Sequence, residues 1–275
     1  YGRRLTFEEL TEFLSDCECA IVGLDKITSE LISYCPQLKV ISKYGVGTDN
    51  IDFIACEKNN IKVIYPKGIN KRSVSEMALG MMISLARNLN SSSLKLKKGV
   101  WVKNGGFQLS EKTVGIIGLG NIGKDLIKLL DPFNVKLLVN DIDKDVCKDF
   151  NVPVEMVDKE KIFSDSDFIS VHTPLNSSTM HLINENTIRK MKSGVILINT
   201  ARGGILNERD VYIALESGHI GGLGIDVYET EPPIDSKILS FDNVICTAHI
   251  GGNSKEAVND MGMFAINKLT EIIKL

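Results

Sequence analysis

The stretch Thr113–Leu130, TVGIIGLGNIGKDLIKLL, joins a short apolar run to a helical pattern through three glycines. Gly118, Gly120 and Gly123 have the spacing G-x-G-x-x-G that follows a strand and opens a helix in dinucleotide-binding folds. In such folds the first glycine allows the tight turn and the second lets the backbone approach a pyrophosphate. The third lets helix and strand pack closely. The stretch therefore predicts a dinucleotide site.

The start of the helix and the end of the next apolar run complete this pattern. Asn121 and Ile122 stand in the first helical turn, whose unpaired N–H groups would face the anion. The next run ends in Asp141, at the position where an acid meets the ribose hydroxyls. A carboxylate there repels a 2′-phosphate, and Ile142 and Asp143 supply no arginine, so NAD is favoured over NADP. The alternative is a purely structural turn with a surface aspartate.

Apolar, β-branched runs alternate with helical patterns along the chain. Continuous apolar strands separated by helices predict an α/β fold, with parallel sheets covered on both faces. We place a domain crossing beside the long helical pattern Ser73–Asn88, which a polar stretch follows. The expected domains are 1–73 with 256–275, and 74–255. Strands are expected within 19–24, 38–45, 61–66, 113–120, 135–141, 167–173, 194–200, 221–227 and 243–249, with further helices over Asn184–Met191, over Asn207–Ser217 and from Lys255 on.

Composition narrows the class of protein. The 275 residues carry a net charge of −3, so nothing indicates a nucleic-acid or anionic-membrane partner. No apolar run approaches the roughly 20 residues of a membrane span. The chain begins with Tyr1, and we expect native N-terminal residues to be missing. Six scattered cysteines without a CxxC pair indicate reduced thiols and a cytoplasmic protein. Cys17 and Cys19 leave a metal or redox site as an alternative, but no metal site is expected, because no histidine or second cysteine pair lies near them in sequence.

Four polar residues follow strand-like runs in the second half of the chain: Arg202, Asp226, Glu231 and His249. In open α/β sheets, ligands bind outside the carboxyl ends of the strands, so these residues point to one edge. Histidine suits the proton transfer that accompanies hydride transfer from an alcohol, and a neighbouring Glu231 would orient its ring. Arginine can bind a carboxylate and polarise a carbonyl. Each residue also has a structural alternative when it is considered alone. His249 could be a histidine of the core, Arg202 could form an ion pair on the surface, and Glu231 could be an acidic residue of a loop.

Several motifs resemble the D-isomer-specific 2-hydroxyacid dehydrogenases in spacing and order. They are GIIGLGNIG, NTARGGILNE, GIDVYETEP and HIGG. KVISKYGVGTDNID, GINKRSVSEMALGMMISLARN and DFISVHTPLN extend the similarity over nearly the whole chain. Among the branches, the phosphoglycerate dehydrogenase-like one looks nearest. The resemblance implies two Rossmann/flavodoxin-like domains, with an NAD-binding domain inserted into a discontinuous substrate domain. It also implies a homodimer built through the cofactor domains and a cleft that closes on a small 2-hydroxy or 2-oxo acid.

The resemblance also assigns roles to residues. Arg202, Glu231 and His249 match the substrate-binding arginine and the acid–base pair of the family, and Asp226 matches the acid near the nicotinamide carboxamide. The residues expected at the substrate are Tyr44, Val46, Gly47, Asn70 and Arg202. The residues expected at NAD are Gly118, Gly120, Asn121, Ile122, Gly123, Asp141, His172, Thr173, Pro174, Thr200, Ala201, Asp226, Gly251 and Gly252.

Departures from the family pattern bear on the substrate. The phosphate-binding arginine expected after the first strand is replaced by Gly23 and Leu24, although Lys26, Lys43, Lys71 or Arg72 could substitute. Phosphoglycerate oxidation and glyoxylate or hydroxypyruvate reduction therefore both stay open. Formate dehydrogenation is disfavoured, because that branch has glutamine in place of Glu231. A cofactor-sensing scaffold, like the corepressors that share the fold, is the alternative from another class.

Overall fold

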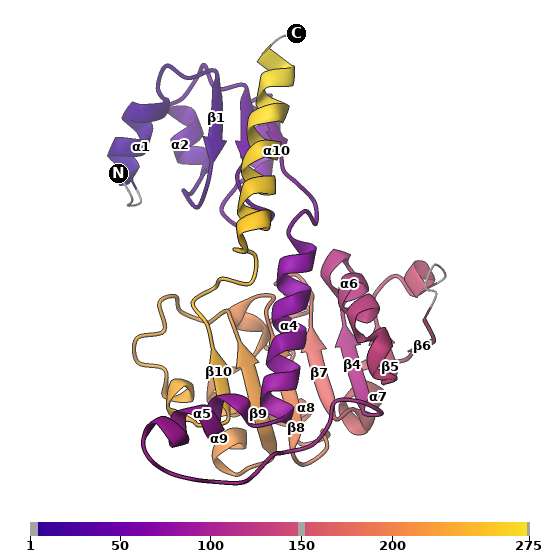
Figure 1. Ribbon diagram of the computed structural model, residues 1–275. Helices are drawn as coiled ribbons and strands as arrows, with labels where there is room; N and C mark the ends of the chain where they lie inside the picture. The colour runs from indigo at the N-terminus through magenta and orange to yellow at the C-terminus, as the bar shows by residue number, and fades with distance from the viewer. Residues whose placement is uncertain (1–4, 148–151, 274–275) are drawn as a thin grey trace. The chain divides into compact units, whose positions relative to one another are not determined.

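The computed structural model describes residues 5–147 and 152–273, and the chain forms two compact units (Figure 1). One unit consists of Tyr1–Asn70 and Asn253–Leu275, and the other of Lys71–Gly252. Both crossings lie three residues before the expected boundaries, at Asn70 rather than 73 and at Gly252 rather than 255. The smaller unit is therefore discontinuous in sequence, and the larger one is inserted into it.

The smaller unit is a parallel sheet of three strands in the order β1-β2-β3. Its core contains Leu14, Leu31 and Ile41. Ser42 on β2 donates a 2.9 Å hydrogen bond to the carbonyl of Ala265, which joins the C-terminal helix to the sheet. The elements are α1 (Phe7–Leu14), β1 (Cys19–Val22), α2 (Ser29–Ser33), β2 (Val40–Lys43), α3 (Phe53–Lys58), β3 (Lys62–Ile64) and α10 (Lys255–Ile273).

The larger unit is a parallel sheet of seven strands in the order β10-β9-β8-β7-β4-β5-β6. From β4 the chain adds β5 and β6 on one side, and then β7 to β10 on the other side of β4. Ligands of open α/β sheets bind at such a switch point in the strand order. The strands are β4 (Thr113–Ile117), β5 (Lys136–Asn140), β6 (Val154–Met156), β7 (Phe168–Val171), β8 (Val195–Asn199), β9 (Ile220–Ile225) and β10 (Val244–Cys246).

Helices cover both faces of this sheet, which explains why its strands read as continuous apolar runs. Met82 and Leu126 come from α4 (Lys71–Ala86) and α6 (Asn121–Leu130) and enter one core. Phe163 and Val211 come from the opposite side and enter the other. That side carries α7 (Lys159–Asp165), α8 (Glu185–Ile188) and α9 (Glu208–Glu216). The remaining elements are α5 (Leu89–Lys97) and four 3₁₀ turns: η1 (Asp131–Phe133), η2 (Lys144–Cys147), η3 (Gly203–Ile205) and η4 (Lys237–Ser240).

The structure differs from the sequence prediction in two local elements. The short edge strand β6 was not expected, because Val154–Met156 is only three residues long and none of them is buried. The polar stretch after Asn88 forms the helix α5, none of whose side chains is buried. Neither difference changes the α/β class or the parallel order of the sheets, which the structure confirms.

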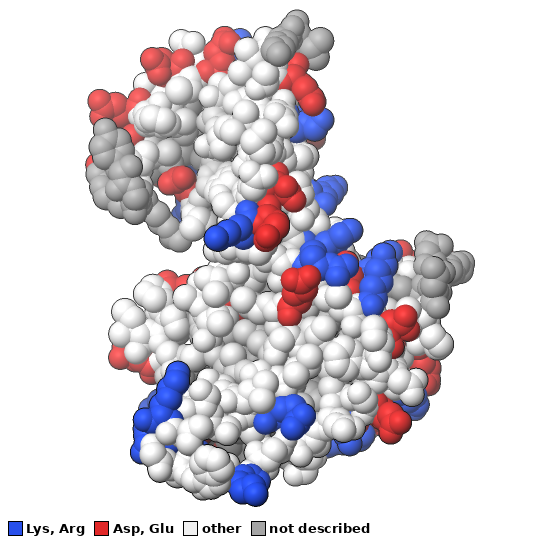
Figure 2. Space-filling model, in the orientation of Figure 1, with Lys and Arg blue, Asp and Glu red and all other residues white. Residues whose placement is uncertain are grey.

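Charges of both signs are interspersed on the face of the molecule in Figure 2, with neither sign forming a continuous field. Within residues 5–147 and 152–273, no helix has the length and apolar character needed to cross a membrane. Among the same residues, no group of three or more His, Cys, Asp or Glu side chains is arranged to hold a metal ion.

Candidate active site

The glycine turn after β4 has the geometry of a phosphate cradle. Gly118 has a φ of +99°, and a Cβ there would lie 2.5 Å from the carbonyl oxygen of His172. A Cβ on Gly123 would lie 2.1 Å from the carbonyl oxygen of Gly118, so helix and turn approach as only glycine permits. At Gly120, by contrast, a Cβ would meet no atom within 4 Å. The turn is thus closed on its protein side and open where α6 begins at Asn121, followed by Ile122.

Asp141 lies beside this turn at the end of β5. Its Oδ2 accepts a 2.6 Å hydrogen bond from the amide of Leu119, and its Oδ1 accepts one of 2.9 Å from Asp143. The carboxylate is therefore fixed against the backbone of the glycine turn. Each oxygen keeps lone pairs for a further donor, so the expected contact with ribose hydroxyls stays a prediction.

Three predicted cofactor residues present buried polar atoms that have no protein partner: His172 Nδ1, Thr173 Oγ1 and Thr200 Oγ1. All three residues follow the carboxyl ends of β7 and β8. Burial lowers the pKa of His172 to about 4, so its ring is neutral near neutral pH, and its Nε2 lies 2.8 Å from Ser170 Oγ. Buried polar groups are normally satisfied, and these atoms together with the open glycine turn fit a bound dinucleotide. Pro174 and Ala201 contribute main-chain contacts nearby, accepting from Thr179 Oγ1 and donating to Asn199 Oδ1.

His249 and Glu231 meet although 18 residues separate them in the chain. His249 Nδ1 lies 2.9 Å from Oε2 and 3.0 Å from Oε1 of Glu231, and half of the His249 side chain is exposed. Glu231 Oε1 also accepts from the amide of Tyr228 at 3.2 Å. An ionised carboxylate only accepts hydrogen bonds, so Nδ1 carries the proton and Nε2 is left to exchange one with a ligand. The two side chains of the expected acid–base pair thus lie together in the larger unit, and their catalytic role stays a prediction.

Asp226, predicted as a cofactor residue, makes contacts within the protein that the sequence did not indicate. Its side chain is 1% exposed, and both oxygens accept hydrogen bonds from the loop that carries His249. Oδ1 accepts from the Thr247 hydroxyl at 2.5 Å and from the Ile250 amide at 2.8 Å. Oδ2 accepts from the Gly251 amide at 2.8 Å, and Gly252 ends this loop. Asp226 therefore anchors the loop Thr247–Gly252, and a contact with the nicotinamide carboxamide stays a prediction.

Arg202 follows β8 at the start of η3 and is half-buried. Its guanidinium donates to the carbonyl of Ala201 at 2.7 Å, while its own carbonyl accepts from Asn199 Nδ2. The next residue, Gly203, lies so close to the strand end of β9 that a Cβ would be 1.9 Å from the carbonyl oxygen of Tyr228. This close approach joins the Arg202 segment to the segment that carries Glu231.

The expected substrate residues Tyr44, Val46, Gly47 and Asn70 all belong to the smaller unit. Tyr44 follows β2, its amide donating to the carbonyl of Val22 at 2.9 Å. Val46 and Gly47 are half-buried, and Asn70 is buried with its Oδ1 unpartnered. Their binding role stays a prediction.

Two of the four cations considered for a substrate phosphate are engaged within their own unit. Lys43 is 2% exposed, and its ammonium donates to the carbonyl of Gly23. Burial lowers the pKa of Lys43, although Asp25 and Asp49 oppose that shift. Arg72 makes two 3.0 Å contacts with the buried carboxylate of Asp125. Lys26 and Lys71 are exposed.

Sequence reasoning missed residues that hold this site together. Tyr228 is buried, and its hydroxyl donates to the carbonyl of Thr247 at 2.8 Å. Ser73 donates to the carbonyl of Gly251 at 2.6 Å. No local sequence pattern predicts either hydrogen bond, because the partners lie 19 and 178 residues apart in the chain.

Comparison with known proteins gives three kinds of similarity. The family model of the D-isomer specific 2-hydroxyacid dehydrogenase, NAD binding domain, matches residues 79–251. A hydroxypyruvate reductase from Thermotoga maritima is 40% identical over 98% of this chain and 89% of its own. A D-3-phosphoglycerate dehydrogenase from Methanocaldococcus jannaschii is 36% identical over 98% of this chain, which spans only 52% of that longer protein. The crystal structure of D-lactate dehydrogenase from Aquifex aeolicus, complexed with NAD and lactic acid, superposes with a TM-score of 0.87 at 30% identity, over 96% of this chain and 85% of that one.

Proposed function

From the premise that this chain belongs to the D-isomer-specific 2-hydroxyacid dehydrogenase family, we propose that it reduces a small, non-phosphorylated 2-oxo acid with NADH. Hydroxypyruvate and glyoxylate are the substrates proposed. The observation that carries the reaction type is the contact of His249 Nδ1 with Glu231, 2.9 Å long, in the same unit as the open glycine turn.

The chain's own residues move the proton. When bound, NADH supplies a hydride to C2 of the oxo acid, and NAD⁺ accepts it in the reverse direction. Glu231 holds the imidazole through Nδ1, so Nε2 of the protonated His249 gives its proton to the carbonyl oxygen as that oxygen becomes a hydroxyl. In oxidation Nε2 takes the same proton back. Arg202 would bind the substrate carboxylate and polarise the carbonyl, because a guanidinium offers two parallel donors.

The smaller unit is proposed to bind the substrate carboxylate through the backbone of Val46 and Gly47. Asn70 adds an unpartnered buried oxygen, which suits a donor such as the substrate hydroxyl. Tyr44 flanks this loop.

The proposal of a non-phosphorylated substrate rests on the engaged cations. Lys43 is buried against the carbonyl of Gly23, and Arg72 is bound to Asp125. A phosphate carries about two negative charges, and cations that are free to approach it stabilise its binding. Phosphoglycerate oxidation remains the second candidate, since relatives with that name are 36% identical and Lys26 and Lys71 are exposed.

Steady-state turnover with NADH and a panel of 2-oxo acids tests the proposal. We expect kcat/KM for hydroxypyruvate or glyoxylate to exceed that for 3-phosphohydroxypyruvate. The reverse order would favour the phosphoglycerate reaction. NADH binding without turnover of any acid would favour a cofactor-sensing scaffold.

We further propose a homodimer formed through the segment Leu89–Phe107 of the larger unit. Seven large apolar side chains of this segment are exposed, with Trp101 at 76%. Such a concentration of exposed apolar surface is typical of an interaction site. Where α5 lies in Figure 1, Figure 2 shows a mainly uncharged surface with a few basic side chains. The exposed residues are Leu89, Leu94, Leu96, Val100, Trp101, Val102 and Phe107.

Light scattering coupled to size-exclusion chromatography tests the dimer. The wild-type chain should have twice the mass of the monomer, and Trp101→Glu should shift it toward the monomer. Leu24→Glu, at an exposed leucine of the smaller unit, is the matched control and should stay dimeric. A monomeric wild type contradicts the proposal.

A cytoplasmic location is also proposed. The cysteines whose side chains the structure describes, at positions 17, 19, 35, 56 and 246, are all free, as expected in a reducing compartment. Fractionation of the native host would test it.

A further inference from the structure

The loop Tyr228–Ser236 carries Glu231 and, after the buried Tyr228, lies at the surface. From Glu229 to Ser236 no residue is buried, and Ile234 is 81% exposed. Apolar packing therefore contributes little to holding this segment, and its position depends on polar contacts.

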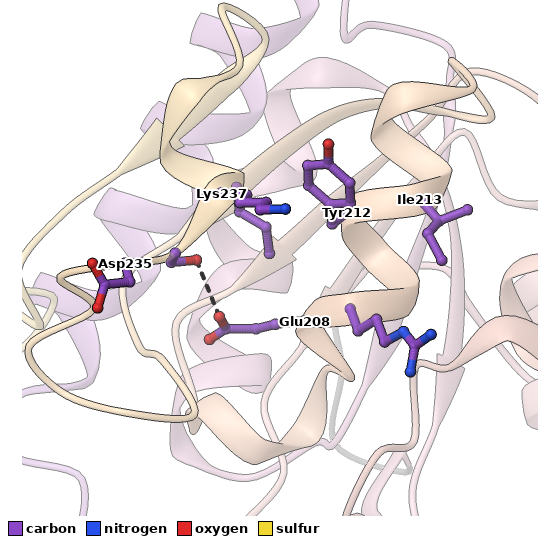
Figure 3. A pocket seen from close by; sticks show the side chains of 8 residues that line it. Glu208, Tyr212, Ile213, Asp235 and Lys237 are labelled. Carbon is purple, nitrogen blue, oxygen red and sulfur yellow. Dashed lines mark hydrogen bonds between the residues drawn. The ribbon is translucent and has the colours of Figure 1, made fainter.

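One carboxylate binds both ends of the segment. Glu208 Oε1 accepts a 2.8 Å hydrogen bond from the amide of Glu229, and Glu208 Oε2 accepts one of 3.2 Å from the hydroxyl of Ser236. The second of these is the dashed line at Glu208 in Figure 3, where Glu208 lies at the start of α9 and faces the loop. Glu231 lies between the two tethered residues.

Glu208 and Glu229 also interact reciprocally, because the carboxylate of each accepts a hydrogen bond from the amide of the other. Glu229 Oε1 accepts from the amide of Glu208 at 3.1 Å. That amide is the first of α9, where a negative charge is favourable. The same oxygen lies 3.2 Å from Nε2 of His181. The start of α9 is thus joined to the loop by hydrogen bonds among Glu208, Glu229 and Ser236.

We propose that Glu208 is a positioning residue for the acid–base pair. By fixing both ends of the Glu231 segment, it places the Glu231 carboxylate against His249 Nδ1. The inference rests on the proposed function, since it gives Glu208 a role in the same proton transfer.

Glu208→Ala tests the inference in the full chain with hydroxypyruvate and NADH. We expect kcat to fall by about tenfold to a hundredfold, because misplacement of a catalytic group by about 1 Å has that effect. KM for hydroxypyruvate and Kd for NADH should stay unchanged. Glu208→Gln should restore most of kcat, because its amide oxygen accepts from Glu229 and its NH₂ can donate to Ser236.

A matched control is Glu216→Ala at the other end of α9, where the carboxylate accepts from the hydroxyl of Tyr212 at 3.0 Å. This variant should keep the wild-type kcat, and a comparable loss there would mean that any damage to α9 suffices, which overturns the inference. An unchanged kcat in Glu208→Ala, or a loss confined to KM, also overturns it.

The double variant separates this inference from the proposed function. If Glu208 acts through Glu231, adding Glu208→Ala to Glu231→Ala should cause no further loss of kcat, whereas independent effects would multiply and contradict it. Glu231→Ala alone tests the proposed function: wild-type turnover in that variant would remove the acid–base pair itself. A loss in Glu231→Ala without one in Glu208→Ala would contradict only the inference.

Discussion

Two loops bring His249 and Glu231 together, and each is held by a carboxylate. The two carboxylates differ in how far they are buried. Asp226 is 1% exposed and accepts three hydrogen bonds from the loop Thr247–Gly252. Glu208 is half-buried and accepts two from an exposed loop. Removing a buried acceptor leaves its donors facing the protein interior, whereas water can replace an acceptor that lies at the surface. We therefore expect the hydrogen bonds of Asp226 to contribute strongly to the free energy of unfolding. Those of Glu208 should mainly fix the local geometry of its loop.

The largest effect on stability is expected from Asp226→Ala. The variant leaves the Thr247 hydroxyl and the Ile250 and Gly251 amides without a buried acceptor, each costing about 1–3 kcal/mol. The free energy of unfolding should fall by about 3 kcal/mol or more, measured by urea denaturation. Glu208→Ala should cost about 1 kcal/mol, since water replaces its partners. Equal losses of stability in the two variants would contradict the comparison, and unchanged stability with weaker NAD binding would support the predicted cofactor role of Asp226.

His249→Ala removes the group that both loops serve. We expect kcat to fall at least about a hundredfold, which corresponds to about 2.7 kcal/mol, because a proton donor is lost from the reaction. NADH affinity, followed by fluorescence, should stay near that of the wild type. Near-normal turnover would dismiss the acid–base assignment.

The buried, neutral histidine that follows β7 predicts how the stability of the protein changes with pH. The pKa of His172 is lowered by burial from 6.5 to about 4, so the unfolded chain binds a proton that the folded chain does not. Stability should therefore fall as the pH drops below 6.5 and level off below 4, by about 2 kcal/mol at pH 5 from this group. In His172→Gln that part of the slope should be absent, as seen in denaturation midpoints between pH 7 and 4. Identical slopes would contradict the burial of this ring.

Thr247→Val gives the smallest effect and sharpens the account of Asp226. It removes one of the three donors while keeping the shape of the side chain, at a cost of about 1 kcal/mol. The melting temperature should fall by about 2–4 °C. A loss as large as that of Asp226→Ala would mean that the hydroxyl alone anchors the loop.

Much of the fold followed from sequence because the larger sheet is covered on both faces. Runs such as Val195–Asn199 are apolar at nearly every position, which marks a buried parallel strand. The edge strand β6 lacks that signal, because one partner strand and partial exposure relax the choice of residues. Helix α5 was missed for a similar reason, since LNSSSLKLK buries no face that would impose helical periodicity.

The candidate site was predictable where topology alone brings residues together. His249 and Glu231 follow neighbouring strands, so their meeting follows from the shared edge of a parallel sheet. The partners of Asp226 and Glu208 were not predictable, since loop hydrogen bonds have no period in sequence. The motif GIDVYETEP predicts a cofactor contact for Asp226, and the structure adds a second role, because its buried carboxylate anchors the loop Thr247–Gly252.

Gly23 has a consequence for how the chain's substrate range can evolve. Its carbonyl accepts from Lys43 and from Asn50, while a side chain added at its Cα would meet no atom within 4 Å. The first carbon of a side chain can therefore be added there without meeting the core. A single substitution, Gly23→Arg, would place a cation at the position where the family resemblance expects the arginine that binds a substrate phosphate.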